Sequence, residues 1–220
     1  QDIGTDIKPL QNDGYALLGS VNTPDEGYQM YLAKTDKFGN LTEEPIIFGG
    51  PFADFAHAMQ INSSGVIYIV GSTISERGGT SDMVLYIITS TEITGPITFG
   101  GSGNEVGYHL QITETGIVLV GYSDERGSKD IYLVVANRNG DEIWSKRYGH
   151  KSGEDIGRFV IPYNGNYLIT GSTNYDTQLN VRNNKNIWLL EIAPENRSPV
   201  NSVFIGGAGD DEGIALLPLT

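Results

Sequence analysis

The sequence predicts an all-β fold of the β-propeller class, and three observations predict it. Four segments of similar sequence recur along the 220 residues, and their leading glycines are separated by 51, 51 and 49 residues: Gly14, Gly65, Gly116 and Gly165. Each repeat holds four short apolar runs rich in Val, Ile, Leu, Tyr and Phe, separated by Gly, Asn, Asp and Ser, which is the composition of strands and turns. No segment keeps a 3.6-residue apolar period over ten or more residues, so we expect no long helix.

The first repeat shows the expected elements in order, with strands at 3–10, 15–20, 29–35 and 45–49. The second run of each repeat, such as YALLG or IVLVG, is apolar on both faces rather than alternating. Such a strand needs cover on both sides, which radially stacked four-stranded sheets provide and a simple sandwich does not. A repeat of about 50 residues also falls in the range of propeller blades.

The repeats divide the chain into four blades and a remainder within a single domain, 1–220. Their approximate bounds are 1–50, 51–101, 102–150 and 151–207, with a partial fifth repeat at 208–220. We therefore predict four four-stranded blades plus one extra C-terminal inner strand at 214–219. The alternative is that the chain is a fragment of a larger propeller. We expect the extra strand to pack on a neighbour or on a second subunit, which would make a homo-oligomer.

Composition excludes several partners. The chain has 14 Lys and Arg against 27 Asp and Glu, a formal net charge of −13, which opposes binding to nucleic acid or to an anionic membrane surface. No apolar run approaches the roughly 20 residues that span a bilayer, so we expect no direct membrane insertion. The absence of cysteine rules out a disulfide framework and thiolate chemistry, and no cofactor-binding motif is present.

The repeat pattern resembles a known family. An acid, a spacer and a small residue precede the first strand, followed by NDGYALLGS, then QMYLAKTDKFGN, then a strand ending in Phe-Gly-Gly. This order is similar to the bacterial β-propeller repeat of the SBBP type over essentially the whole chain. The chain departs from it in keeping the Asp-Gly-Tyr turn only at residues 13–15, and the expected tryptophan only at Trp144. The resemblance implies an exported bacterial protein at an extracellular, cell-surface or periplasmic location.

An acidic series recurs at the start of the first strands: Asp2, Asp54, Glu105, Asp155 and Asp211. One interpretation is a metal site for a hard cation such as Ca²⁺, with Asp54, Glu105 and Asp155 as the candidate ligands. A second is paired acids for glycoside cleavage. The favoured interpretation is structural: each acid accepts backbone N–H bonds in its own glycine-rich turn, because catalysis needs an asymmetric pair rather than copies of one arrangement.

A second recurring position carries different polar side chains on the first strands: Thr5, His57, Tyr108 and Arg158. If they face a common channel, they form a candidate ligand site, and the alternative is ordinary packing between blades. The loop between the second and third strands varies most among repeats and is longest at 173–185, which contains Tyr175. Because functional contacts concentrate on variable loops over a rigid scaffold, we include Tyr175 in the candidate ligand site.

These observations lead to three functional hypotheses. The first is a non-catalytic binding module that recognises a protein or a glycan on the face carrying the second-to-third-strand loops. The alternative is a structural or assembly domain. The third is a glycosidase or lyase that uses Asp54, Glu105 or Asp155. No nucleophile elbow, zinc-binding or phosphate-binding motif is present, so we assign no catalytic residue.

Overall fold

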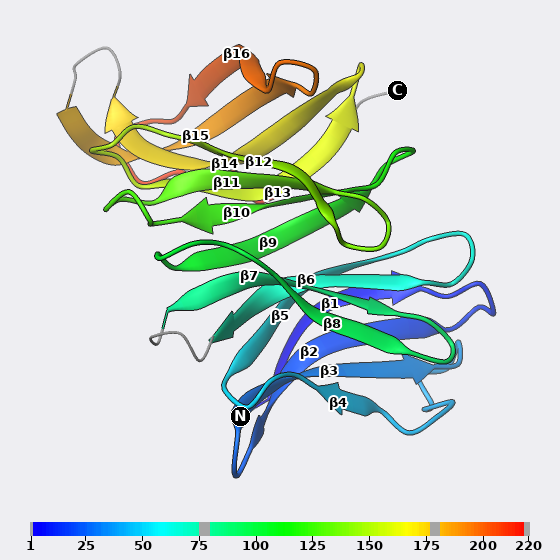
Figure 1. Ribbon diagram of the computed structural model, residues 1–220. Coiled ribbons are helices and arrows are strands. Elements are labelled where there is room, and N and C mark those ends of the chain that lie inside the picture. The colour runs from blue at the N-terminus through cyan, green and yellow to red at the C-terminus, as the bar shows by residue number, and fades with distance from the viewer. Residues whose placement is uncertain (1, 75–79, 177–180, 218–220) are drawn as a thin grey trace. The chain divides into compact units, whose positions relative to one another are not determined.

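The computed structural model describes residues 2–74, 80–176 and 181–217. These residues form sixteen strands and no helix (Figure 1). The strands make four antiparallel sheets of four strands, here called blades 1 to 4. Blade 1 contains β1 (Ile3–Pro9), β2 (Tyr15–Thr23), β3 (Gly27–Thr35) and β4 (Ile46–Phe48). Blade 2 contains β5 (Asp54–Ile61), β6 (Ile67–Ile74), β7 (Ser81–Ile88) and β8 (Ile93–Phe99). Blade 3 contains β9 (Glu105–Ile112), β10 (Ile117–Ser123), β11 (Asp130–Ala136) and β12 (Glu142–Tyr148). Blade 4 contains β13 (Asp155–Tyr163), β14 (Asn166–Asp176), β15 (Val181–Ala193) and β16 (Ser198–Ile205).

Every blade is a simple meander in which strands adjacent in sequence are adjacent in the sheet. This order confirms the four strands predicted for each repeat. It follows from the short turns, because tight hairpins pair consecutive strands antiparallel.

The chain forms two compact units, Gln1–Gly100 with blades 1 and 2 and Gly101–Thr220 with blades 3 and 4. The boundary lies one residue before the predicted repeat boundary between 101 and 102. In the first unit the core lies between the two sheets, where Ala16 and Leu18 of blade 1 meet Ile67 and Ile69 of blade 2. In the second unit the side chains at the corresponding positions do the same: Val118, Val120, Tyr167 and Ile169.

A β-bulge interrupts the first strand of every blade at the same register. In each blade one residue of the first strand, directly after a Gly or Ala, has no partner in the register of the second strand. These residues are Thr5, His57, Tyr108 and Arg158. The bulge brings the first strand's backbone close to a glycine of the second strand. At Gly121 a Cβ atom would overlap the carbonyl oxygen of Val106, and the same holds at Gly19, Gly71 and Gly171. The glycine that ends each apolar run is therefore required by this close approach.

Two predicted elements differ from the structure. The polar segment 173–185 is largely strand, because β14 and β15 extend as a hairpin arm in which Tyr175 pairs with Arg182; residues 177–180 lie outside the described part. The predicted extra strand at 214–219 is not formed over 214–217, and 218–219 lie outside the described part. A strand needs a partner for its backbone groups, and the described residues supply no second strand there.

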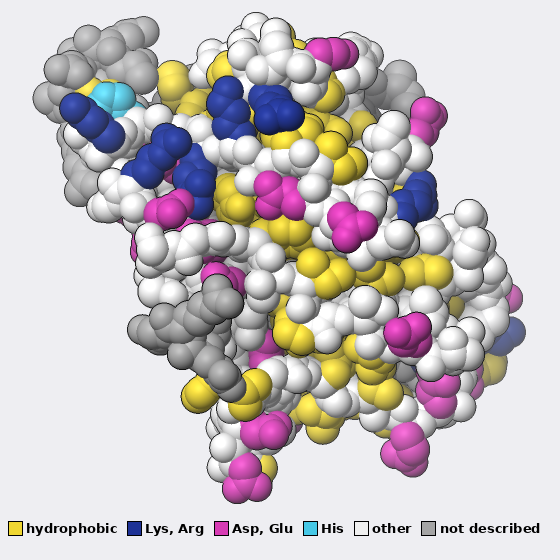
Figure 2. Space-filling model, viewed as in Figure 1, with side chains coloured by type: hydrophobic (Ala, Val, Ile, Leu, Met, Phe, Trp, Pro, Cys, Tyr) yellow, Lys and Arg dark blue, Asp and Glu magenta, His cyan; other side chains and the backbone are white. Residues whose placement is uncertain are grey.

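Charge is distributed unevenly between the units. Ten of the fourteen Lys and Arg residues belong to the second unit. Figure 2 shows their side chains gathered mostly over the part of the view that contains blades 3 and 4. Among the residues that the model describes, none forms a helix long and apolar enough to cross a membrane.

Candidate functional site

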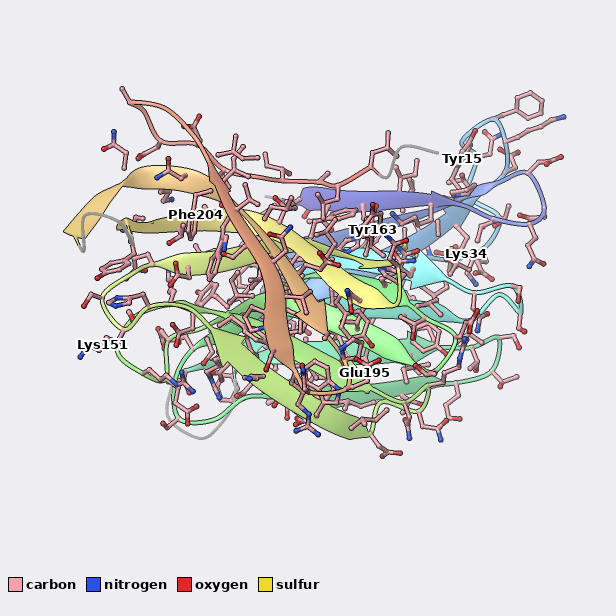
Figure 3. All side chains as sticks on the ribbon, turned by 90° about the horizontal axis from the view of Figure 1, so that it is seen from above. Tyr15, Lys34, Lys151, Tyr163, Glu195 and Phe204 are labelled. Carbon is pink, nitrogen blue, oxygen red and sulfur yellow. The ribbon has the colours of Figure 1, made fainter. Side chains whose placement is uncertain are left out.

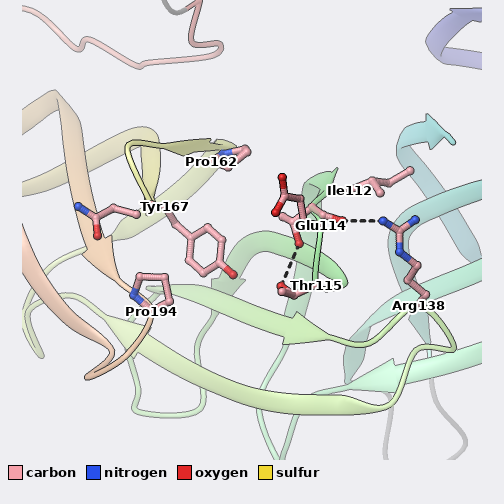
Figure 4. Close-up of a pocket in the computed structure, with 10 residues that line it drawn as sticks. Ile112, Glu114, Thr115, Arg138, Pro162, Tyr167 and Pro194 are labelled. Carbon is pink, nitrogen blue, oxygen red and sulfur yellow. Dashed lines mark hydrogen bonds between the residues drawn. The ribbon is translucent and has the colours of Figure 1, made fainter. Parts of the chain in front are cut away.

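A groove in the second unit lies between blades 3 and 4, on the side of their first hairpins. Its volume is about 780 Å³. Ile112, Pro162, Tyr167 and Pro194 supply apolar surface, and polar side chains stand beside them: Thr113, Glu114, Thr115, Arg138 and Asn166. Figure 4 shows the Tyr167 ring between Pro162 and Pro194. The arrangement combines an apolar floor with a polar margin, as small-molecule sites do.

Tyr167 is fixed by the core beneath it. The side chain is 7% exposed, and its ring lies 6.2 Å from the indole of Trp144. Burial raises the pKa of the Tyr167 phenol above its ordinary value. The ring thus forms a rigid part of the floor.

Arg138 stands on a tight turn that holds it over the groove. Asn137 Oδ1 accepts hydrogen bonds from the backbone N–H groups of Asn139 (2.8 Å) and Asp141 (3.0 Å), and Gly140 takes a φ of 90°. The Arg138 Nη2 donates to the carbonyl oxygen of Thr113 at 2.7 Å (Figure 4). This bond uses only one of the five guanidinium N–H groups, and the side chain as a whole is exposed.

The first unit contains a smaller counterpart of about 390 Å³ between blades 1 and 2. There Gln11 Nε2 donates to the carbonyl oxygen of Ser63 at 2.6 Å, a bond that joins the two hairpins. Ile67 lines it at the position that Tyr167 takes in blade 4. Both grooves therefore arise where two blades stack. The groove between blades 3 and 4 owes its polar and aromatic character to its own lining side chains.

The recurring acids have the turn role that the sequence favours. Asp54 Oδ2 accepts from Gly50 N–H at 2.7 Å, and Glu105 Oε2 from Gly101 N–H at 3.0 Å. Asp155 Oδ2 accepts from His150 N–H and Asp211 Oδ2 from Gly207 N–H, both at 2.8 Å. Asp54, Glu105 and Asp155 are at most 1% exposed. Burial raises the pKa of Asp54, and raises that of Asp155 to about 6.

Asp130 is a buried acid that the repeat analysis missed. It is 1% exposed, and burial raises the pKa of its carboxyl, which the nearby Arg126 and Arg147 partly offset. A Cβ atom added at Gly149 would meet carboxylate oxygens of both Asp130 and Asp155, so the two acids lie beside the same glycine. At the equivalent positions blades 1 and 4 carry amides, Gln29 and Asn186. The signal in the sequence was this exchange of an amide for an acid at the start of the third strand.

The four variable bulge residues do not all meet. In the second unit the Arg158 guanidinium lies over the Tyr108 ring at 4.1 Å, and its Nε donates to Glu212 Oε1 at 2.7 Å. In the first unit Thr5 Oγ1 donates to the carbonyl oxygen of Leu18 at 3.4 Å, and His57 is half-buried on β5. Tyr108 and Arg158 therefore form one cluster with Glu212, and the bulge explains why this position tolerates different side chains.

Tyr175 and the candidate metal ligands belong to the packing of blade 4 and of the turns. Tyr175 is 6% exposed and its ring stacks on the His150 imidazole, with ring centres 3.5 Å apart. Among the described residues, no group of three or more His, Cys, Asp or Glu side chains has the geometry of a metal site. A Ca²⁺ ion at Asp54, Glu105 or Asp155 stays a prediction.

Sequence reasoning placed the candidate surface on the opposite side of the blades. The loops joining second and third strands vary in length, whereas the groove lies at first-strand hairpins of nearly constant length. The groove forms where two neighbouring repeats meet, and two of its side chains differ from those at the aligned positions of the first unit. The exchange of Ile67 for Tyr167 and of Lys37 for Arg138 in the aligned repeats was the available signal.

Comparison with solved structures shows a likeness of fold. The chain is similar to the crystal structure of a thermostable family-43 glycoside hydrolase, with a TM-score of 0.53 and 14% sequence identity, over 96% of this chain and 74% of that one. At this identity the likeness concerns the fold alone, and it supports a β-propeller-like all-β architecture. No family model matches the sequence, and no curated protein matches it. Membership of the SBBP-type repeats stays a prediction.

Proposed function

We propose that this protein is a carbohydrate-binding module that holds its ligand in the groove between blades 3 and 4. The observation that carries the proposal is the pairing of the Tyr167 floor with the exposed Arg138 and Glu114 at one open groove. The proposal keeps the predicted class of function, a binding module for a glycan. It places the ligand on the side of the first hairpins.

The lining suits a pyranose ring. A sugar has an apolar face of C–H groups, which packs on an aromatic ring and prolines, and a periphery of hydroxyls. Pro162 and Pro194 offer most of the first kind of surface, and Tyr167, which is 7% exposed, adds a small part of it. Glu114 accepts hydrogen bonds, Arg138 donates them, and Asn166 does both, so the margin can pair with hydroxyls of either polarity.

The groove lacks the acid pair of a glycosidase. Hydrolysis of a glycosidic bond requires two carboxyl groups on opposite sides of the scissile bond, roughly 5–10 Å apart. Among the described lining residues Glu114 is the one carboxylate. The predicted acids Asp54, Glu105 and Asp155 are buried in their turns, where a substrate does not reach them. These facts favour binding without turnover.

A glycoside hydrolase is the second candidate, and the structural likeness favours it. The similar structure is titled a family-43 glycoside hydrolase, and it covers 96% of this chain. Both candidates share a carbohydrate ligand, so one set of experiments separates them.

The test combines binding with turnover. The protein is screened against a panel of soluble polysaccharides by affinity electrophoresis, and hits are titrated by calorimetry. Arg138→Ala should weaken binding at least tenfold. Lys37→Ala is the matched control, because Lys37 occupies the same place in the equivalent turn of blade 1 and should leave binding unchanged.

Two results would contradict the proposal. Equal loss of binding in both variants would show that the groove is not the site. Release of reducing sugar from any polysaccharide or aryl glycoside in the panel, abolished by a carboxyl-to-amide change, would establish the hydrolase instead.

A further inference from the structure

Blade 1 exposes an apolar sheet face. Along β2 the side chains alternate: Ala16 and Leu18 are buried against blade 2, whereas Tyr15 is 39% and Leu17 36% exposed. Ile3 on β1 is 40% exposed on the same blade. A shallow pocket on this face is lined by Ile3, Leu17, Val21 and Tyr31, with Asp2 at its edge. Figure 3 labels Tyr15 at the hairpin end of this blade.

The repeats show what kind of surface covers this face. The residues aligned with Tyr15 and Leu17 are Ile67 and Ile69 in blade 2, and Tyr167 and Ile169 in blade 4. All four are at most 7% exposed, because each pair packs on the sheet of the preceding blade within its unit. The surface that fits is therefore another blade, presenting small and branched apolar side chains from its second and third strands.

Blade 4 exposes the complementary kind of face. Ile205, on β16, aligns with Phe48 and Tyr148, which are 9% and 6% exposed because they face the next blade; Ile205 is 53% exposed. Val203, two residues earlier, is 39% exposed. The next-blade side of blade 4 is covered in part by 211–217, where Gly213 N–H donates to the carbonyl oxygen of Gly171 at 3.0 Å. The segment 211–217 lies where the first strand of a fifth blade would lie, as its sequence predicts. The described residues supply no second strand to pair with it.

Charge favours contact between unlike faces. The unit containing blade 1 carries 4 Lys and Arg against 12 Asp and Glu, and the unit containing blade 4 carries 10 against 15. The formal charge is therefore −8 for the unit containing blade 1 and −5 for the unit containing blade 4, so contact between unlike units brings less like charge together than contact between two units that contain blade 1.

We propose that the exposed face of blade 1 docks the blade 4 face of a second copy of this chain. The contact is heterologous, because the two copies use different surfaces, so it generates closed rings or open chains rather than a two-fold dimer. The occupant is specified by the repeat register: the side chains of Leu168, Ile187, Val203 and Ile205 of the second copy meet those of Ile3, Tyr15, Leu17 and Tyr31. This proposal does not depend on carbohydrate binding.

Light scattering coupled to size exclusion tests the association over a concentration series of the full chain. We expect the mass to rise above that of the 23.9 kDa chain with concentration. Leu17→Glu should raise the protein concentration at which half of the chains are associated by at least tenfold. Phe38→Glu, a change at a 78% exposed ring elsewhere on blade 1, should not. Circular dichroism checks that both variants are folded.

Crosslinking identifies the surfaces, and the absence of native cysteine makes the experiment clean. Leu17→Cys and Ile205→Cys proteins are prepared separately and treated with a short bis-maleimide, alone and mixed. We expect a covalent species of two chains in the mixture and little in either protein alone. Phe38→Cys mixed with Ile205→Cys is the matched control.

Three outcomes would overturn the proposal. One is a constant mass of 23.9 kDa at all concentrations. Another is equal crosslinking of Leu17→Cys alone, which would mean that like faces meet. The third is a double variant, Leu17→Cys with Ile205→Cys, that crosslinks only within one chain, which would identify the chain's own blade 4 as the occupant.

Discussion

Asp155→Asn should remove the loss of stability with rising pH that the Asp155 carboxyl itself contributes. The Asp155 carboxyl is 1% exposed, and burial raises its pKa from 3.8 to about 6, with the nearby Asp130 and Glu154 adding to the shift. The turn bond from His150 N–H, at 2.8 Å, opposes the shift without cancelling it. The asparagine keeps an oxygen for this bond and carries no titrating proton.

The sign and size follow from linkage. A carboxyl with a higher pKa in the folded state binds its proton more tightly there, so its stabilising effect is complete below pH 3.8 and is lost as the pH rises through 6. A shift of this size corresponds to about 3 kcal/mol in full, of which about 2 kcal/mol falls between pH 4 and pH 8. The free energy of unfolding of the variant should fall by about 2 kcal/mol less over that interval.

The assay is urea unfolding followed by tryptophan fluorescence at several pH values. Both tryptophans, Trp144 and Trp188, belong to the same unit as Asp155, so the signal reports its unfolding. Parallel pH profiles for the wild type and Asp155→Asn would refute the reasoning. Asp36→Asn gives the opposite case, because hydrogen bonds from Asn40 lower the pKa of Asp36 and its effect is lost as the pH falls. The free energy of unfolding of Asp36→Asn should therefore differ from the wild type in its pH dependence only at acid pH, in urea titrations followed by circular dichroism.

Two further predictions address the blade architecture. Gly121→Ala should lower the free energy of unfolding by about 3 kcal/mol, because its Cβ would overlap the Val106 carbonyl oxygen, whereas Gly207→Ala, with open space around it, should be neutral in the same urea titration. Glu212→Gln should leave global stability within about 1 kcal/mol but accelerate amide exchange at Gly213, because it weakens the 2.7 Å ion pair with Arg158 that anchors 211–217; unchanged exchange measured by mass spectrometry would contradict this role.

The strands were predictable because the same sequence pattern recurs four times along the chain, once in each repeat. The glycine at the end of YALLG and the acid five or six residues after Phe-Gly or Tyr-Gly recur at nearly constant spacing, and the structure gives both a role within the blade. Gly19 and its equivalents give room to the bulged first strand, and Asp54 and its equivalents hold their turns. Repetition therefore identified the positions that the blade itself requires.

The groove could not be predicted in the same way, because it arises where two repeats meet. Its residues come from the first hairpins of blades 3 and 4 and from the last turns of both, segments up to about 80 residues apart. The segment 173–185 misled for a related reason: its polar composition is typical of a loop, yet its residues pair across an extended hairpin arm. Strands pair through backbone groups, which polar residues supply as well as apolar ones, so composition alone does not separate a paired arm from a loop.

Variation between repeats therefore carries the functional information, and it falls at a few register positions. The residue four positions before the recurring glycine of the second strand is Tyr15, Ile67, Ile117 or Tyr167, and its surroundings decide its role. In blade 4 it is covered by blade 3 and forms the floor of the groove, while in blade 1 it is open to a partner. The same position of the repeat thus bears on both proposals: Tyr167 packs on the preceding blade of its unit, whereas Tyr15 has no preceding blade in its unit. A variant at Tyr15 should affect association alone, and one at Tyr167 should affect ligand binding and the core together, which gives the two proposals separate experimental readouts.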